Sequence, residues 1–383
     1  MDPSPNPIPR SRKALFVAVI ILAPLACLLL CGEFAVRIFH KQAVDTERLR
    51  ADLKANSIAA IVKNSDDVVL GFELIPGKVC EFKNATVSIS PGGYRRSSHS
   101  VTNPPPAVRV AVLGDSTAFG WGVEYEAGFP DVFRKRMEML SGKVVELRNY
   151  AVPAYNSEQE SRLFTQRVLR SYAPDLVILG YDHNDPEPAL SPLLGALPPE
   201  YGDNPFHSML WKYVVRKARQ KWTRLQSFGL NRHKYIKNTV GRFIIGGPLY
   251  DRHLKALQQI AEEARKRAIP VVAVVHNPFV VFNPEYERSP DYILLSQRIS
   301  TLLSGLGFHV LDLTPRYQEK MKTERIANLT GSWLSPQDCH PNPAGHEYIA
   351  ECLVQCVTNT PDLMHVFVRS NSQGADDKPR GKL

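Results

Sequence analysis

Ser116 and His340 lie in two short motifs whose residue types suit the transfer of an acyl group. Ser116 belongs to the motif VLGDST at residues 112–117, and His340 belongs to DCHPN at residues 338–342. A serine hydroxyl is a weak nucleophile until a base removes its proton. A histidine imidazole, whose usual pKa is about 6.5, can remove it near neutral pH. Together the two residues could attack an ester carbonyl.

Each motif also has a simpler, structural interpretation. Gly114 permits a tight turn after a short apolar run, which puts Ser116 at the start of a helical turn. Free backbone N–H groups and the helix dipole there favour developing negative charge, but a serine at this position can also merely cap a helix. The histidine motif could likewise be the capped start of the apolar helix expected at residues 348–357.

Two more polar loops each follow directly on a predicted strand. They are NYAVPAYN at residues 149–156 and GYDHND at residues 180–185, and either could be an ordinary turn. We predict strands at 108–113, 144–147, 176–179, 271–275 and 310–313, and helices at 129–139, 158–171, 254–268 and 292–303. This alternation indicates a parallel sheet covered on both faces. Sites in such folds lie at the carboxyl ends of the strands, so we expect the motifs to meet there.

The four motifs, in this order between residues 108 and 357, resemble the four blocks of the SGNH (GDSL-like) hydrolase family. The resemblance implies an α/β fold of three layers, α/β/α, with a flavodoxin-like parallel sheet of about five strands. The preceding segment, with Pro76-Gly77 and Gly93-Tyr94-Arg95, resembles a lead-in found in membrane-anchored bacterial members.

The resemblance also implies roles for individual residues. Ser116 is then the nucleophile, His340 the general base and Asp338 the carboxylate that orients the imidazole. The backbone N–H groups of Ser116 and Ala154 and the side-chain amide of Asn184 form the oxyanion hole, in which each donor typically contributes about a hundred- to a thousandfold in rate. Three neighbours are expected to support the site from behind: Asp115, His183 and Asp185.

Two positions depart from the family pattern. The oxyanion position of the second motif is usually glycine and is Ala154 here, and because alanine resists a positive φ the loop could differ in shape. The acid usually stands three residues before the histidine, where this chain has Gln337, so we expect Asp338 to take its place. His346 is expected to be structural or to support the site from behind. The α/β-hydrolase elbow G-x-S-x-G is one residue away from GDSTA, but that fold places several strands before its serine.

An uncharged run of 19 residues, 14–32, is long enough to cross a bilayer. Arg10, Arg12 and Lys13 precede it, which predicts a cytoplasmic N-terminus at residues 1–13 and a single-pass inner-membrane protein with a periplasmic catalytic domain. A cleaved signal peptide and a lipoprotein signal are the alternatives. We further expect a lead-in and linker at 33–107, the hydrolase domain at 108–365 with an insertion at 186–250, and a disordered tail at 366–383. Apolar residues at near-helical spacing predict a helix over 41–69 within the lead-in.

The net charge of +9 is concentrated in residues 205–250, which contain no acidic residue. This segment is either a solvated surface or a lid or docking element that contacts anionic lipid or an anionic polysaccharide. No nucleic-acid-binding motif accompanies the charge, so we expect no nucleic-acid partner. The six cysteines contain no CxxC pair, and Cys352 and Cys356 are spaced poorly for a disulfide. We expect no metal and no organic cofactor.

The sequence therefore favours a serine esterase that forms an acyl-enzyme and acts on an acylated carbohydrate, lipid or other ester outside the cytoplasm. An O-acyltransferase that uses a polysaccharide hydroxyl in place of water is the nearest alternative. A catalytically silent binding module that keeps the fold is the alternative from another class. The sequence does not indicate the acyl group or the alcohol of the substrate.

Overall fold

The computed structural model describes residues 10–39, 58–98, 106–182, 184–187, 208, 210–211, 213–214, 246–276, 290–325 and 340–368. Contacts divide the chain into two units, one formed by residues 1–54 with 195–232 and the other by residues 55–194 with 233–383.

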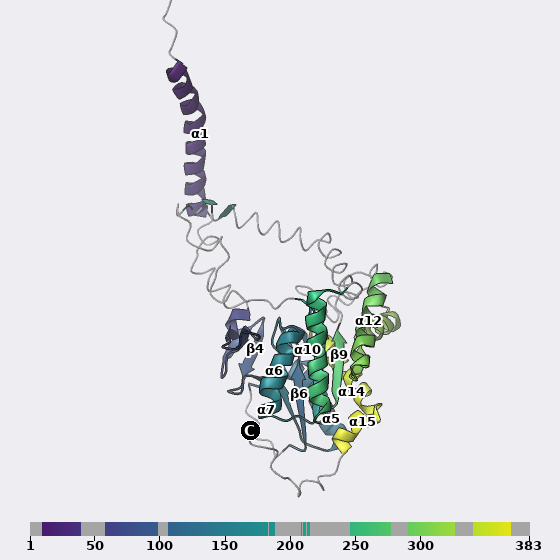
Figure 1. Ribbon diagram of the computed structural model, residues 1–383. Helices are drawn as coiled ribbons and strands as arrows, with labels where there is room; N and C mark the ends of the chain where they lie inside the picture. Colours follow the sequence, from purple (N-terminus) through teal and green to yellow (C-terminus); the bar gives the residue numbers. More distant parts are fainter. Residues whose placement is uncertain are drawn as a thin grey trace, which may run out of the picture. The chain divides into compact units, whose positions relative to one another are not determined.

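The first unit contains the helix α1, Arg10–Phe39 (Figure 1). Its segment Val19–Phe39 has a mean hydropathy of 2.5 and is, within the described parts of the chain, the helix long and apolar enough to cross a membrane. Large apolar side chains such as Leu28 and Leu30 are exposed along it. The helix includes the expected anchor at 14–32 and is compatible with a membrane span or with a signal sequence.

The second unit is built on one large sheet. Among its described strands, five run parallel: β6 (Val108–Leu113), β7 (Val145–Asn149), β8 (Leu176–Asp182), β9 (Val271–His276) and β10 (His309–Asp312). Their order is β10-β9-β8-β6-β7, so the strand order reverses at β6, where open α/β sheets place their sites. This confirms the predicted parallel sheet. Each predicted strand is found, with ends shifted by at most three residues.

Helices cover both faces of this sheet, which makes β6, β8 and β9 almost entirely buried. On one face α6 (Ser157–Leu163) packs against α10 (Pro248–Arg265), and both lie in front of the strands in Figure 1. α6 continues through the single-turn π-helix η3 (Phe164–Val168) into α7 (Leu169–Ser171). α5 (Phe129–Ser141) packs separately against α14 (Pro343–Thr358) and α15 (Pro361–Val368).

Other described helices follow β6 or lie in sequence on either side of β10. α4 (Ser116–Phe119) and η2 (Tyr125–Ala127) follow β6, and α12 (Pro290–Gly305) connects β9 to β10. α13 (Leu313–Glu324), which was not predicted, follows β10 directly because Asp312 caps it by accepting the backbone N–H of Thr314 at 2.9 Å.

The lead-in forms strands where the sequence indicated a helix. Helical spacing of apolar residues predicted a helix over 41–69; this is wrong for 58–69, and residues 41–57 lie outside the described ranges. After η1 (Ile58–Ala60), β1 (Val62–Asn64) pairs with β2 (Phe72–Leu74). β3 (Val79–Phe82), β4 (Ala85–Ile89) and β5 (Arg95–Arg96) extend the large sheet antiparallel beyond β7. Packing overrides the spacing because Ile61 and Phe72 are fully buried in the core.

The insertion expected at 186–250 lies mostly outside the described residues, so its role as a lid or docking element stays a prediction. α10 begins at Pro248, six residues before the predicted start at residue 254. α15 extends to Val368, and the remainder of the expected tail is not described.

Candidate active site

Ser116 is the first residue of α4, directly after the carboxyl end of β6. Gly114 makes the turn between them with φ +138°, and a Cβ there would lie 2.9 Å from the Gly180 carbonyl oxygen and 2.7 Å from the Ala118 Cβ. Only glycine fits this position without displacing neighbouring atoms. Asp115 caps α4 by accepting the Thr117 backbone N–H at 3.0 Å. The sequence thus directs Ser116 to the edge of the sheet where its neighbours meet.

His340 lies 224 residues later and reaches Ser116. Its Nε2 is 2.8 Å from the Ser116 Oγ, the distance of a hydrogen bond through which a proton can pass. The backbone enters α14 just after it, where the Asn342 Oδ1 accepts the Gly345 backbone N–H at 2.9 Å. His340 is therefore held at the start of an ordered helix. Gln337, Asp338 and Cys339 lie outside the described residues, as does His183.

The second motif approaches the serine from β7. Its backbone is tied to the strand that precedes Ser116, because the Tyr150 N–H donates to the Val112 carbonyl at 2.8 Å and the Val152 N–H to the Gly114 carbonyl at 3.0 Å. Ala154 adopts φ +70°. The alanine therefore keeps the left-handed conformation that the family's glycine favours, at a typical penalty of about 1 kcal/mol.

Asn184, from the third motif, lies beside the nucleophile turn. Its side chain hydrogen-bonds the Asp115 carboxyl. Burial raises the pKa of Asp115, and this hydrogen bond offsets a part of that rise. Its Oδ1 is buried with no hydrogen-bond partner in the described structure. The Asn184 side chain, whose amide is expected in the oxyanion hole, thus contacts Asp115, the residue that precedes Ser116.

Four carboxyl groups are buried behind Ser116: Asp115, Glu160, Asp182 and Asp185. Burial, followed by the nearby Asp182, raises the pKa of Asp115 to about 6. Burial also raises the pKa values of Glu160 and Asp185 well above their usual range, and the neighbouring carboxylates add to the shift. Asp185 Oδ2 accepts the Asp182 backbone N–H at 3.0 Å and so shapes the third motif. Asp115 and Asp185 are both buried, and their role in supporting the site stays a prediction.

The structure adds His276, which sequence reasoning missed. It ends β9, and its Nδ1 lies 3.4 Å from the Asp182 Oδ2. Asp115, Thr117, Asp182 and His276 line a buried cavity of about 10 Å³, roughly the room needed by one water molecule. The sequence signal that could have identified His276 is its position at the end of an apolar strand, where the first three motifs also lie.

His346 has the structural role expected of it. It is fully buried, its Nδ1 accepts the Phe129 backbone N–H at 3.2 Å, and its ring stacks on the Phe129 ring. Burial lowers the pKa of His346 to about 3, so the ring is neutral. No group of three metal-ligating side chains is found in the described ranges. Cys80, Cys352 and Cys356 are free thiols, in line with the poor disulfide spacing of the last two.

Known proteins resemble this chain in sequence family and in fold. The model of the GDSL-like Lipase/Acylhydrolase family matches residues 112–348. Similar solved structures include TesA (15% identity, TM-score 0.40, covering 66% of this chain and 98% of that one) and the acetyl xylan esterase AlAXEase (15%, 0.40, 65% and 100%). A lipase/acylhydrolase from Enterococcus faecalis is also similar (14%, 0.38, 66% and 96%). No curated protein matches the sequence significantly. Because the family match extends over more than half of its length, the chain belongs to the GDSL-like lipase/acylhydrolase family and is an SGNH-type hydrolase.

Proposed function

We propose that the chain is a serine esterase in which Ser116 forms an acyl-enzyme. The observation that carries this proposal is the 2.8 Å contact between the Ser116 Oγ and the His340 Nε2. The contact joins residues 224 positions apart at the switch point of the parallel sheet. A nucleophile and a base within hydrogen-bond reach are the minimum that acyl transfer requires.

In the acylation step, His340 Nε2 takes the Ser116 proton as the Oγ attacks the ester carbonyl carbon. The carbonyl oxygen becomes an oxyanion, to which the backbone N–H groups of Ser116 and Ala154 and the Asn184 amide donate. When the tetrahedral intermediate collapses, the C–O bond to the alcohol breaks and the alcohol leaves with the proton held by His340. Water then repeats the sequence on the acyl-enzyme and releases the acid.

Asp338 is the proposed partner of the imidazole. A carboxylate there would fix the tautomer that leaves Nε2 free to accept the serine proton, and would stabilise the imidazolium that forms. Asp115 is engaged elsewhere: it caps α4, and its Oδ2 accepts a hydrogen bond from the Ser116 Oγ at 3.4 Å.

We further propose that the substrate is an ester outside the cytoplasm, such as an acylated carbohydrate or lipid. The support is α1, whose apolar segment would anchor the chain in the inner membrane with residues 33–383 in the periplasm. Fusion reporters joined after Val368 would test this: a reporter active only in the cytoplasm should stay silent, and its activity would contradict the orientation.

A fluorophosphonate probe followed by graded esters tests the enzymatic proposal. The wild-type chain in detergent should be labelled, Ser116→Ala should not be, and short activated esters should be hydrolysed. If hydrolysis is slow but the acyl group passes to an added sugar hydroxyl, the same residues serve as an O-acyltransferase. Equal labelling of wild type and Ser116→Ala would contradict the assignment of the nucleophile.

A further inference from the structure

Trp121 lies directly against the proposed base. Its ring is stacked on the His340 imidazole, with ring centroids 5.0 Å apart and planes inclined by 21°. Trp121 lies two residues after the end of α4, and its backbone N–H donates to the Ser116 carbonyl at 3.0 Å. Trp121 therefore contacts the turn that carries Ser116 through its backbone and the His340 imidazole through its side chain.

The β3–β4 turn packs on the same indole. Phe82, at the end of β3, meets the Trp121 ring edge-on, with centroids 4.9 Å apart and planes at 85°. The Nζ of Lys83 lies 5.3 Å from the Trp121 ring centroid. Lys83 and Asn84 both have positive φ, 53° and 65°, which is the conformation of a tight two-residue hairpin turn. The β3–β4 turn of the lead-in thus restrains the Trp121 indole in addition to the stack on the His340 imidazole.

Arg95, from β5, holds the backbone on both sides of Trp121. Its Nη1 donates to the carbonyls of Phe119 at 2.6 Å and Gly120 at 2.7 Å, and its Nη2 donates to that of Val123 at 2.6 Å. The side chain is fully buried, and burial lowers the pKa of Arg95 to about 10, which leaves it charged at neutral pH. Charged donors make these bonds stronger than neutral ones.

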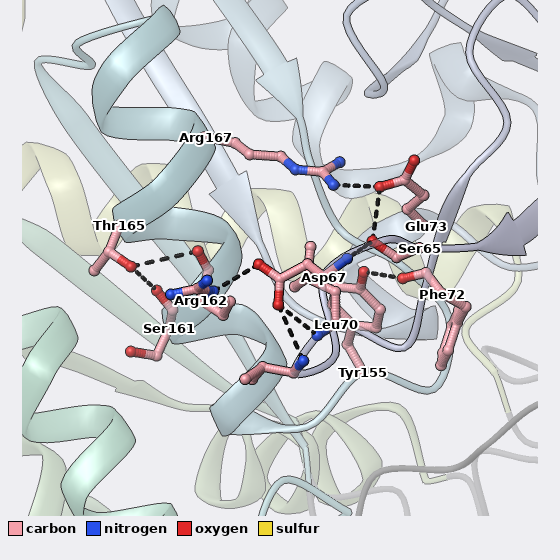
Figure 2. A network of polar contacts seen from close by, with 11 residues as sticks. Ser65, Asp67, Leu70, Phe72, Glu73, Tyr155, Ser161, Arg162, Thr165 and Arg167 are labelled. Atoms are coloured by element: carbon pink, nitrogen blue, oxygen red, sulfur yellow. Dashed lines mark hydrogen bonds and ion pairs between the residues drawn. The ribbon is translucent and has the colours of Figure 1, made fainter.

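The lead-in is itself fastened to α6 and η3, as Figure 2 shows. Arg162 Nε donates to Asp67 Oδ2 at 2.6 Å, and Arg167 pairs with Glu73. Tyr155, the neighbour of Ala154, donates through its hydroxyl to the Phe72 carbonyl at 2.5 Å. These contacts fix β1, β2 and the turn between them to the body that carries the second motif. The strands that restrain Trp121 join the same body by pairing, since β3 pairs with β4, β4 with β5, and β5 with β7.

From these contacts we infer that Trp121 is a positioning residue for His340, and that Arg95 and the β3–β4 turn of the lead-in hold it in place. A base must keep its nitrogen within a few tenths of an ångström of the serine proton, and a stacked ring limits rotation and tilt of the imidazole. The lead-in is then a part of the catalytic unit and not a spacer between the membrane and the enzyme. The inference rests on the proposed function, since it presumes that His340 is the base.

Turnover of an activated ester by the full chain in detergent tests the inference. Trp121→Leu should lower kcat by about ten- to a hundredfold with a much smaller change in KM, because substrate binding does not need the stack. Trp121→Phe should recover most of kcat, since a flat ring remains. If Trp121→Leu cannot be purified folded, Trp121→Met takes its place because it also removes the flat ring, and an unchanged kcat in that variant would overturn the inference.

Tyr94→Leu is the matched control. Tyr94 also belongs to the lead-in, but its ring packs on Tyr150 and under the Arg148 guanidinium. Its loss should reduce stability without lowering kcat. Equal losses of kcat in Tyr94→Leu and Trp121→Leu would show a general effect of damaged packing and would overturn the positioning role.

A double-mutant cycle separates the part played by Arg95. Arg95→Lys keeps the charge but loses the forked donor, and should lower kcat several-fold in the wild-type background. In the Trp121→Leu background the same change should have little further effect on kcat, because the two residues act in series. Equal factors in both backgrounds would contradict the inference.

Ser116→Ala distinguishes failure of this inference from failure of the proposed function. If Ser116→Ala keeps full turnover, the proposed function itself is wrong. If Ser116→Ala is inactive while Trp121→Leu keeps wild-type kcat, the proposed function stands and the positioning role of Trp121 is wrong.

Discussion

Thr117 Oγ1 donates a hydrogen bond to Asp182 Oδ2 at 3.0 Å, and this bond joins the residue after the nucleophile to the end of the neighbouring strand β8. Both side chains are buried. The bond fixes α4 against the third motif, and with it the distance between Ser116 and Asn184. The bond therefore contributes to the placement of two of the three proposed oxyanion donors, Ser116 at the start of α4 and Asn184 after β8.

Thr117→Val should therefore lower both the unfolding free energy of the protein and its kcat. Valine keeps the shape of threonine but removes the donor, and a buried carboxylate that loses a donor typically costs about 1–3 kcal/mol of unfolding free energy. Denaturant unfolding and kcat would measure both effects. Thr165→Val is the control, because the Thr165 Oγ1 donates to carbonyls of the preceding helical turn, those of Ser161 at 2.9 Å and Arg162 at 3.3 Å, and not to a carboxylate. Similar losses in the two variants would contradict a special role for the Thr117 bond.

Ala154→Gly should stabilise the protein and keep its activity. Ala154 has φ +70°, and glycine adopts this conformation without the steric penalty of about 1 kcal/mol that alanine has. The larger freedom of glycine in the unfolded chain offsets part of that gain. Ala173→Gly, at φ 47° and distant from the motif residues in sequence, should behave in the same way. Thermal unfolding and kcat would be compared; a large fall of kcat in Ala154→Gly alone would show that the alanine side chain has a catalytic role.

Glu160→Gln should stabilise the protein more at high pH than at low pH. Both carboxylate oxygens of Glu160 are buried with no hydrogen-bond partner in the described parts, and burial raises the pKa of Glu160 well above its usual value. A group whose pKa is raised in the folded state favours folding below its unfolded pKa of about 4.3, and this contribution is lost as pH rises through the folded pKa. The difference in Tm between variant and wild type should therefore grow from pH 5 to pH 9.

Glu263→Gln is the control for that pH series. Hydrogen bonds from Lys266, then from Arg267, lower the pKa of the exposed Glu263, so any contribution to stability is present above its unfolded pKa and is lost as pH falls. The variant should show no stability gain that grows with pH. A Glu160→Gln gain that is flat across the pH range would show that the carboxyl is not titrating in the folded protein.

The parallel sheet and the meeting of Ser116 with His340 followed from the sequence, because buried parallel strands are continuous apolar runs with polar residues at their ends. β6 and its motif show this most clearly, since the strand begins and ends at the predicted residues. The lead-in strands were missed because β3, β4 and β5 are short and are stabilised by pairing with other strands rather than by their own pattern: β3 pairs with β4, β4 with β5, and β5 with β7. Trp121 and His276 were missed because a stacked ring and a buried histidine are defined by residues distant in sequence.

The basic segment at 205–250 gives a prediction from charge alone. If it contacts anionic lipid, the protein should bind anionic vesicles more tightly than neutral ones. Salt should release it, because exposed charges are screened over about 10 Å at 0.1 M. Equal binding to neutral and anionic vesicles would contradict the contact with anionic lipid. Binding to an anionic polysaccharide instead would favour the acyltransferase alternative.

The central claim is that Ser116 and His340 work as one unit, and the rate loss of the double variant measures this most directly. Turnover of an activated ester would be measured for Ser116→Ala, His340→Ala and the double variant, with Asp338→Asn and Gln337→Ala beside them. Residues that act together are non-additive, so each single change should cost about as much as the pair. Asp338→Asn should be slower than wild type, and Gln337→Ala nearly unchanged. The account predicts one common floor for the three Ser116 and His340 variants; full turnover by Ser116→Ala, or losses that multiply in the double variant, would contradict it.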